Sequence, residues 1–227
     1  MTHRASSKPS DTSLLTFVDD NSDTDVRAAY QSQHLVHQNL AEALAQSTVL
    51  LDSLSPEARA VAQWTIGKVR FEQGDLPAAR ASMRSALRTC RQAGLQGVEG
   101  AVWLSIAAVL VEMGHTAKSL EALRRAEPLV RGVEVGRLEQ QRLYVLLDLG
   151  EWSEALAAAE RALPLIRSEA DHVGEARLIL LRGLCHLGTG AHGAAISDFR
   201  RRNPALSSVV REVCRRCRRC SFKLAPA

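Results

Sequence analysis

Three cysteines near the C-terminal end carry the sharpest chemical signal: Cys214, Cys217 and Cys220 follow one another at three-residue steps. Thiolates are soft metal ligands, and such short spacings let them converge on one zinc ion or iron–sulfur cluster. A closed site needs a fourth ligand, and no cysteine follows in the remaining seven residues. On a helix the thiols lie beside Val210 and Val213, so we interpret them as small apolar residues of an amphipathic helix, or as part of a disordered tail. We therefore expect no metal and no other cofactor.

The histidines offer weaker alternatives. His34 and His37 are three residues apart and would share a helix face, but no carboxylate or third histidine is close enough in sequence to complete a metal site. Cys185 and His186 are adjacent, yet consecutive residues of a helix point about 100° apart and form no catalytic dyad. The glycines of residues 188–190 lack the Lys-Ser/Thr pair of a phosphate-binding loop. The sequence thus presents no catalytic residues, and we expect a protein that is not an enzyme.

Charge is distributed unevenly along the chain. Residues 200–227 contain nine basic residues against one acidic residue, Glu212, for a net charge of +8. The whole chain carries +4, so residues 1–199 carry −4. Arginine-rich segments neutralise phosphates, which makes binding of nucleic acid or of an acidic surface by the tail an alternative function. Against it, the tail has a single aromatic residue, Phe222, and no helix typical of base recognition.

Composition excludes several classes of protein. The 227 residues are 46% apolar, 4% aromatic and 24% charged, unlike a wholly disordered or collagen-like chain. No run approaches about 18 apolar residues, so we expect no transmembrane helix. The first 25 residues lack the pattern of a secretory signal, and five cysteines give no disulfide framework. We therefore expect a cytoplasmic protein.

An internal repeat organises the middle of the chain. Gly74, Gly114, Gly150 and Gly190 each separate two helix-length apolar segments, at spacings of 40, 36 and 40 residues. Alignment of the second glycine with the third gives eight identities, and one of them is a proline, which helical composition alone would not supply. The identical pairs are Gly114/Gly150, Leu120/Leu156, Ala122/Ala158, Arg125/Arg161, Ala126/Ala162, Pro128/Pro164, Leu129/Leu165 and Arg131/Arg167.

Each unit has the pattern of a helix, a tight turn and a second helix. In residues 101–113, Trp103, Ile106 and Leu110 recur at helical spacing, and Gly114 follows as a left-handed C-terminal cap. No useful period-2 alternation of apolar residues and no Asn-Gly or Asp-Gly hairpin is present. The sequence therefore predicts an all-α protein.

Within each unit the spacing of small residues resembles the second half of the tetratricopeptide repeat. A glycine is followed after five residues by alanine, after four more by a large or apolar residue, and after three more by alanine. The matching sets are Gly74-Ala79-Met83-Ala86, Gly150-Ala155-Ala159-Ala162 and Gly190-Ala195-Phe199, with Ser119 replacing alanine in the unit of Gly114. The resemblance covers about residues 58–204 and implies an α-solenoid of antiparallel helix pairs with about four repeats.

The chain then divides into four parts. Residues 1–22 are expected to be a disordered N-terminus. Residues 23–54 are expected to be an N-terminal helical segment or degenerate repeat, and the sequence is compatible with either one helix or a helix pair there. Residues 55–204 form the predicted repeat array. Residues 205–227 are expected to form a basic Cys/Arg-rich C-terminal helix or tail.

The resemblance also implies a function: a non-catalytic scaffold that binds a peptide or protein partner in a concave groove lined by the first helix of each pair. It places at the groove Lys68, Phe71, Glu72, Leu104, Ala108, Glu112, Arg137, Gln140, Tyr144, Arg177, Leu180 and Leu184. Phe71, Tyr144 and Leu180 would form apolar pockets, and Arg137 and Arg177 would bind a carboxylate. Packing of several of these residues between repeats is the alternative.

A narrower resemblance concerns residues 111–132 and 175–201, which are similar to the repeat arrays that precede caspase-like CHAT domains in bacteria. The catalytic His and Cys of that family lie in a separate domain after the repeats, and we expect no room for it before Ala227. The implied third alternative is the regulatory repeat region of a split or truncated protease.

Overall fold

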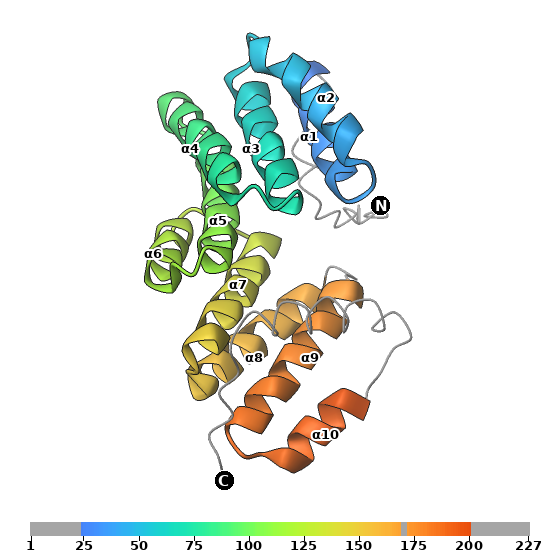
Figure 1. Ribbon diagram of the computed structural model, residues 1–227, viewed down its shortest axis with the longest axis vertical. Helices are drawn as coiled ribbons and strands as arrows, with labels where there is room; N and C mark the ends of the chain where they lie inside the picture. Colours follow the sequence, from blue (N-terminus) through green and yellow to red (C-terminus); the bar gives the residue numbers. More distant parts are fainter. Residues whose placement is uncertain (1–23, 169–171, 201–227) are drawn as a thin grey trace, which may run out of the picture.

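The computed structural model describes residues 24–168 and 172–200, and every regular element in these ranges is a helix (Figure 1). This confirms the all-α prediction. The helices are α1 (Thr24–His34), α2 (Leu40–Val49), α3 (Pro56–Glu72), α4 (Leu76–Ala93), α5 (Gln96–Glu112), α6 (Thr116–Ala126), α7 (Val133–Leu149), α8 (Trp152–Ser168), α9 (His172–Gly188) and α10 (His192–Arg200), with 3₁₀ turns at Leu35–His37 and Leu50–Asp52. In the N-terminal segment, for which the sequence allowed either one helix or two, the chain forms the pair α1 and α2. The predictions for residues 1–22, for the basic tail and for Cys214, Cys217 and Cys220 lie outside the described residues.

Local sequence sets the ends of these helices. Asn39, Ser55 and Asp75 cap α2, α3 and α4, because each side chain accepts a hydrogen bond from a backbone N–H in the first turn. The four repeat glycines lie in the turns within the pairs, and all have left-handed backbones: the φ values of Gly74, Gly114, Gly150 and Gly190 are 82°, 74°, 77° and 77°. An L side chain is strained at such angles, so glycine is the residue that reverses the chain there.

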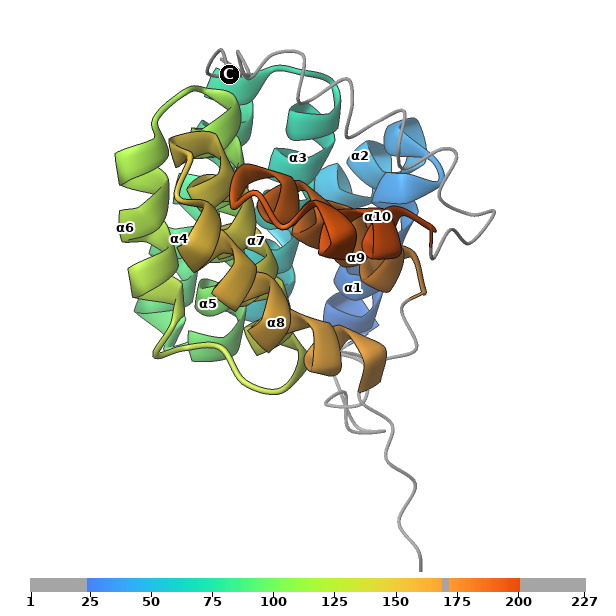
Figure 2. The same ribbon diagram turned by 90° about the horizontal axis from the view of Figure 1, so that it is seen from below.

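Successive helices pack as antiparallel pairs, and the pairs stack into a solenoid (Figures 1 and 2). The first helices of neighbouring pairs contact one another: α1 contacts α3, α3 contacts α5, α5 contacts α7, and α7 contacts α9. The second helices α4, α6 and α8 pack instead against the first helix of the following pair. The first helices therefore form the inner column of the solenoid, and the second helices form its outer side.

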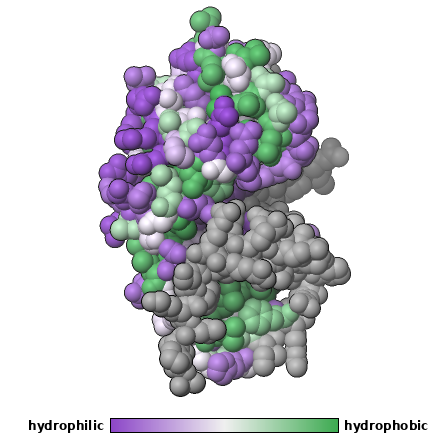
Figure 3. Space-filling model, viewed as in Figure 1, coloured by the Kyte–Doolittle hydropathy of each residue, from purple (hydrophilic) through white to green (hydrophobic). Residues whose placement is uncertain are grey.

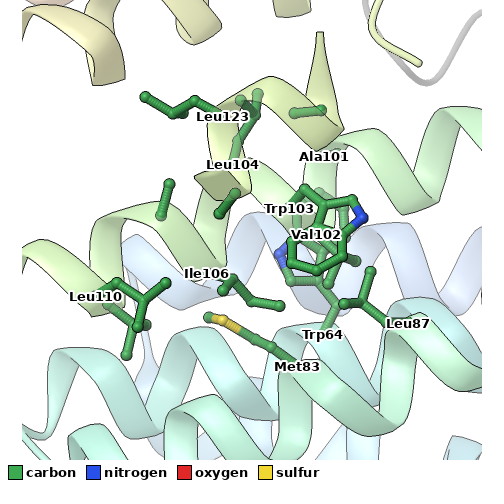
Figure 4. Packing of buried hydrophobic residues seen from close by; sticks show 14 of the residues in the cluster. Trp64, Met83, Leu87, Ala101, Val102, Trp103, Leu104, Ile106, Leu110 and Leu123 are labelled. Atoms are coloured by element: carbon green, nitrogen blue, oxygen red, sulfur yellow. The ribbon is translucent and has the colours of Figure 1, made fainter. Parts of the chain in front are cut away.

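Two large hydrophobic clusters fill the solenoid from α3 to α9, and both include residues of α7; two smaller clusters pack α1, α2 and the 3₁₀ turns against α3. The first cluster runs from α3 to α7 and includes Trp64, Met83 and Trp103, which Figure 4 shows packed together. α7 contributes Leu138 to this cluster and Leu143 to the second, which continues through α8 and α9. α7 thus belongs to both large clusters, and the core consists of separate clusters along the array.

Close helix crossings explain the alternation of small and large residues found in the sequence. A Cβ atom on Gly67 of α3 would lie 2.7 Å from Cγ of Met83 on α4. A Cβ atom on Gly183 of α9 would lie 2.5 Å from Cε1 of Phe199 on α10. Both distances are far below van der Waals contact, so the large residue of each pair fills the space that its glycine leaves.

Among the described helices, none combines the length and the apolar character that crossing a membrane requires.

Candidate functional site

The inner helices carry all the residues that the sequence placed at the groove. Lys68 and Phe71 lie on α3, Arg137, Gln140 and Tyr144 on α7, and Arg177 and Leu180 on α9. Of these seven, Arg137 is exposed and the other six are half-buried; of the remaining predicted residues, Glu72 is exposed, Leu104 is buried, and Ala108, Glu112 and Leu184 are half-buried. The inner face is thus neither a closed core nor a fully solvated surface.

A charged cluster joins α3 to α7 across this face. Nζ of Lys68 lies 5.5 Å from the centre of the Trp64 ring, which is the geometry of a cation–π contact. Nε1 of Trp64 donates a hydrogen bond of 2.8 Å to Oγ of Ser105 on α5, and this bond fixes the orientation of the ring. Burial lowers the pKa of Lys68 to about 8; the positive charge of Arg137 lowers it further, whereas the charge of Glu134 opposes the shift.

Arg137 is itself held in place by a carboxylate. Its Nη1 lies 2.6 Å from Oε1 of Glu134, one turn earlier on α7, and Glu134 is buried. The positive charge of Arg137 lowers the pKa of Lys68, so the two cations interact electrostatically although they come from repeats that are not neighbours in sequence. Lys68 and Arg137 are thus two predicted groove residues whose charges are coupled in the structure.

Other predicted groove residues take part in packing. Phe71 packs against the first hydrophobic cluster, and Tyr144 and Leu180 pack against the second, so each presents only part of its side chain to the inner face. Leu104 corrects the expectation directly: it is buried in the first cluster, with 6% of its surface exposed. The physical reason is that α5 packs against α3, α4, α6 and α7 and is covered on most sides.

Two residues of the cluster, Trp64 and Glu134, were not among the groove residues predicted from the sequence. Each had a local signal, because Trp64 precedes Lys68 by four residues and Glu134 precedes Arg137 by three, the spacings at which side chains meet on a helix. On the face shown in Figure 3, hydrophobic and hydrophilic residues are intermixed over the N-terminal helices. Charge and shape together, rather than a broad apolar patch, distinguish the α3–α7 cluster.

Comparison with known proteins places the fold. No protein-family model matches the chain, and no curated protein matches its sequence. Solved structures do match, at 11–13% identity, a level that bears on the fold alone. They include BtubC (BKLC) from P. vanneervenii (12% identity, TM-score 0.59, 78% of this chain and 86% of that one) and a kinesin light chain from Podosopora anserina with repeats like the tetratricopeptide repeat (TPR) (11%, 0.57, 83% and 99%). Bacillus thuringiensis PlcR in complex with the peptide PapR7 and DNA also matches (13%, 0.60, 91% and 77%).

The chain has a TPR-like repeat fold. This agrees with the family resemblance drawn from the turn glycines and the small residues that follow them. From α3 to α9 the helices have 17 or 18 residues, except for α6 with 11. These long helices, together with the connection of residues 127–132 after α6, account for repeat spacings above the usual 34 residues.

The array holds few groups suited to covalent or metal chemistry in the ranges that the structure describes. Cys90 and Cys185 are buried, and burial raises the pKa of each thiol to about 12, so both stay protonated at neutral pH. His34 and His37 are exposed at the end of α1 and in the following 3₁₀ turn. No group of three or more His, Cys, Asp or Glu residues there could hold a metal ion.

Proposed function

We propose that the TPR-like array binds a peptide or an extended segment of a partner protein on its inner face, without catalysing a reaction. The observation that carries this proposal is that two electrostatically coupled cations from separate inner helices are each held by a neighbouring side chain, Lys68 over the ring of Trp64 and Arg137 by Glu134. TPR-like folds generally bind proteins or peptides, and PlcR, a protein of similar fold, was solved with the peptide PapR7. That precedent supports the class of ligand.

The arrangement favours a ligand with one carboxylate. Trp64 and Glu134 hold the two cations before any ligand arrives, so binding orders few side chains and costs less entropy. Glu72 and Glu134 lie close enough to raise the pKa of Lys68, so they offset part of the positive charge. A single acidic side chain or a C-terminal carboxylate suits this balance better than a polyanion such as nucleic acid.

The test begins with selection of peptides from a display library on the immobilised chain, followed by affinity measurements on the best binder by fluorescence anisotropy. Lys68→Met and Arg137→Gln should each weaken binding by roughly tenfold or more, since hydrogen bonds to charged groups contribute about 1.5–3 kcal/mol. Arg84→Gln is the matched control, because Arg84 is an exposed cation on the outer helix α4. It should leave the affinity unchanged.

A chain cut after Pro204 separates this proposal from binding through the basic tail. On the groove proposal the shortened chain keeps the peptide, and the affinity depends little on salt because few counterions are released. If the shortened chain loses the peptide while Lys68→Met and Arg137→Gln keep it, the basic tail is the functional element and the groove proposal is wrong.

A further inference from the structure

A concavity lies on the outer side of the array, where α6, α7 and α8 meet. It has a volume of about 520 Å³ and an apolar floor formed by Leu120, Leu123 and Leu146. We call it the outer crevice. Its residues on α7, Arg142 and Leu146, are offset by two positions from the groove residues Gln140 and Tyr144, and two positions correspond to about 200° around a helix. The outer crevice and the inner groove therefore use nearly opposite faces of α7.

An irregularity in the repeat creates this crevice. α6 ends at Ala126, before Pro128, whereas the equivalent Pro164 lies inside the longer α8. The connection from α6 to α7 then occupies residues 127–132, in contrast to residues 94–95 between α4 and α5. α6 consequently packs less extensively on α7 than α4 does on α5. The gap that opens between α6 and α8 is the outer crevice.

A buried carboxylate organises the charged walls of the crevice. Glu139 of α7, whose side chain is 8% exposed, accepts a hydrogen bond of 2.7 Å from Nη1 of Arg142. Its Oε2 also accepts bonds of 3.0 and 2.9 Å from Nε and Nη2 of Arg161 on α8. Arg142 further pairs with Glu127 at 3.2 Å. Two guanidinium groups are thus fixed at the crevice before any ligand is present.

Donors remain available on both walls. Nη1 of Arg161 makes no hydrogen bond within residues 24–168 and 172–200, and the Arg161 side chain is 53% exposed. On the opposite wall Arg124 is exposed and has neither an ion pair nor a hydrogen bond in the described part of the chain. Glu154, at the start of α8, is the one lining carboxylate there without an ion pair. The described part of the crevice thus offers one cation without an ion pair, Arg124, one spare donor on the ion-paired Arg161, and one acidic group without an ion pair, Glu154.

We propose that the outer crevice is a second peptide-binding site, for a partner segment that carries a carboxylate beside an aliphatic side chain. The aliphatic side chain packs on Leu120, Leu123 and Leu146, and the carboxylate accepts hydrogen bonds from Arg124 and Arg161 across the crevice. Glu154 repels this carboxylate and so disfavours segments with several acidic residues. The site does not depend on the inner groove and stands if the groove proposal fails.

The test is an NMR titration of the full isotope-labelled chain with two capped peptides, acetyl-Ala-Leu-Glu-Ala-amide and acetyl-Ala-Leu-Lys-Ala-amide. The glutamate peptide should shift backbone amide signals of α6 and α8 in a saturable way, and the lysine peptide should bind at least roughly fivefold more weakly. Absence of saturable shifts on α6 and α8 with the glutamate peptide, or equal binding of the two peptides, overturns the proposal.

Variants of the two walls test the sign of the charge effect. Arg124→Ala should weaken the glutamate peptide by roughly fivefold or more, and Glu154→Gln should strengthen it by roughly twofold. Both residues are exposed, so neither change should prevent folding. Lys118→Ala, which removes an exposed cation of α6 outside the crevice, is the control and should leave the affinity unchanged. Weaker binding of the glutamate peptide by Glu154→Gln, together with unchanged binding by Arg124→Ala, would refute the assignment.

Discussion

Titration of Lys68 tests the geometry of the inner groove without any ligand. A pKa of about 8 means that about nine-tenths of the Lys68 side chains are charged at pH 7 and about one-tenth at pH 9. The sequence has only four lysines, so the ¹³Cε signals of a lysine-labelled sample are few, and Lys68→Arg identifies the one that belongs to Lys68. Arg137→Gln should raise the pKa of Lys68 towards its ordinary value, because it removes a neighbouring positive charge and leaves the charge of Glu134 uncompensated.

The same shift has two further consequences. An acidic peptide that needs charged Lys68 should bind roughly tenfold more weakly at pH 9 than at pH 7, whereas Lys68→Arg should bind it almost equally at both. The folded pKa lies below the ordinary value of 10.5, so the folded chain binds fewer protons than the unfolded chain between pH 8 and 10.5. The contribution of Lys68 to the free energy of unfolding therefore rises with pH over that interval. A Lys68 signal that titrates near the ordinary pKa of 10.5 would refute the burial of this amine and with it the preorganised cluster.

Three other predictions concern packing and metal content. Gly67→Ala should lower the free energy of unfolding, measured in urea, by about 1–2 kcal/mol, because overpacking against Met83 exceeds the gain in helix propensity. Gly97→Ala, where no atom lies within 4 Å of the added methyl group, should raise the free energy of unfolding by up to about 1 kcal/mol. Equal stabilisation by both variants would contradict the close crossing. Ala162→Trp at a fully buried position should destabilise the array by about 1–3 kcal/mol or more, measured by thermal melting of the circular dichroism signal, and an unchanged melting temperature would contradict it. Elemental analysis should find no stoichiometric zinc or iron, and one metal per chain that disappears in Cys217→Ser would overturn that expectation.

The repeat architecture was predictable because its signals are local. A turn glycine with positive φ, such as Gly74, and a large residue nine positions later, such as Met83, report on the geometry of a single helix pair. Identical residues nevertheless behave differently in different repeats: Pro128 follows the end of α6, whereas Pro164 lies within α8. The outer crevice arises from that difference, and the alignment of the two prolines gives no sign of it.

The candidate groove was predictable only as a set of positions. Lys68 and Arg137 are separated by 69 positions, and their proximity depends on the curvature of the stack, which no single repeat encodes. The burial of Leu104 likewise follows from the four helices around α5 rather than from the pattern within it. Local spacing therefore identified the inner helices, and tertiary packing decided which of their side chains share a surface.

The shared position of α7 has a consequence for how the array unfolds. In a linear array, stability is close to a sum over neighbouring interfaces, so the least packed interface divides the chain into cooperative units. Here that interface is α6–α7, and the two hydrophobic clusters are joined through α7, which places Leu138 in one and Leu143 in the other. Amide hydrogens of α8 and α9 should therefore exchange in a common opening event distinct from that of α3 and α4, and α7 should act as the boundary between two folding units.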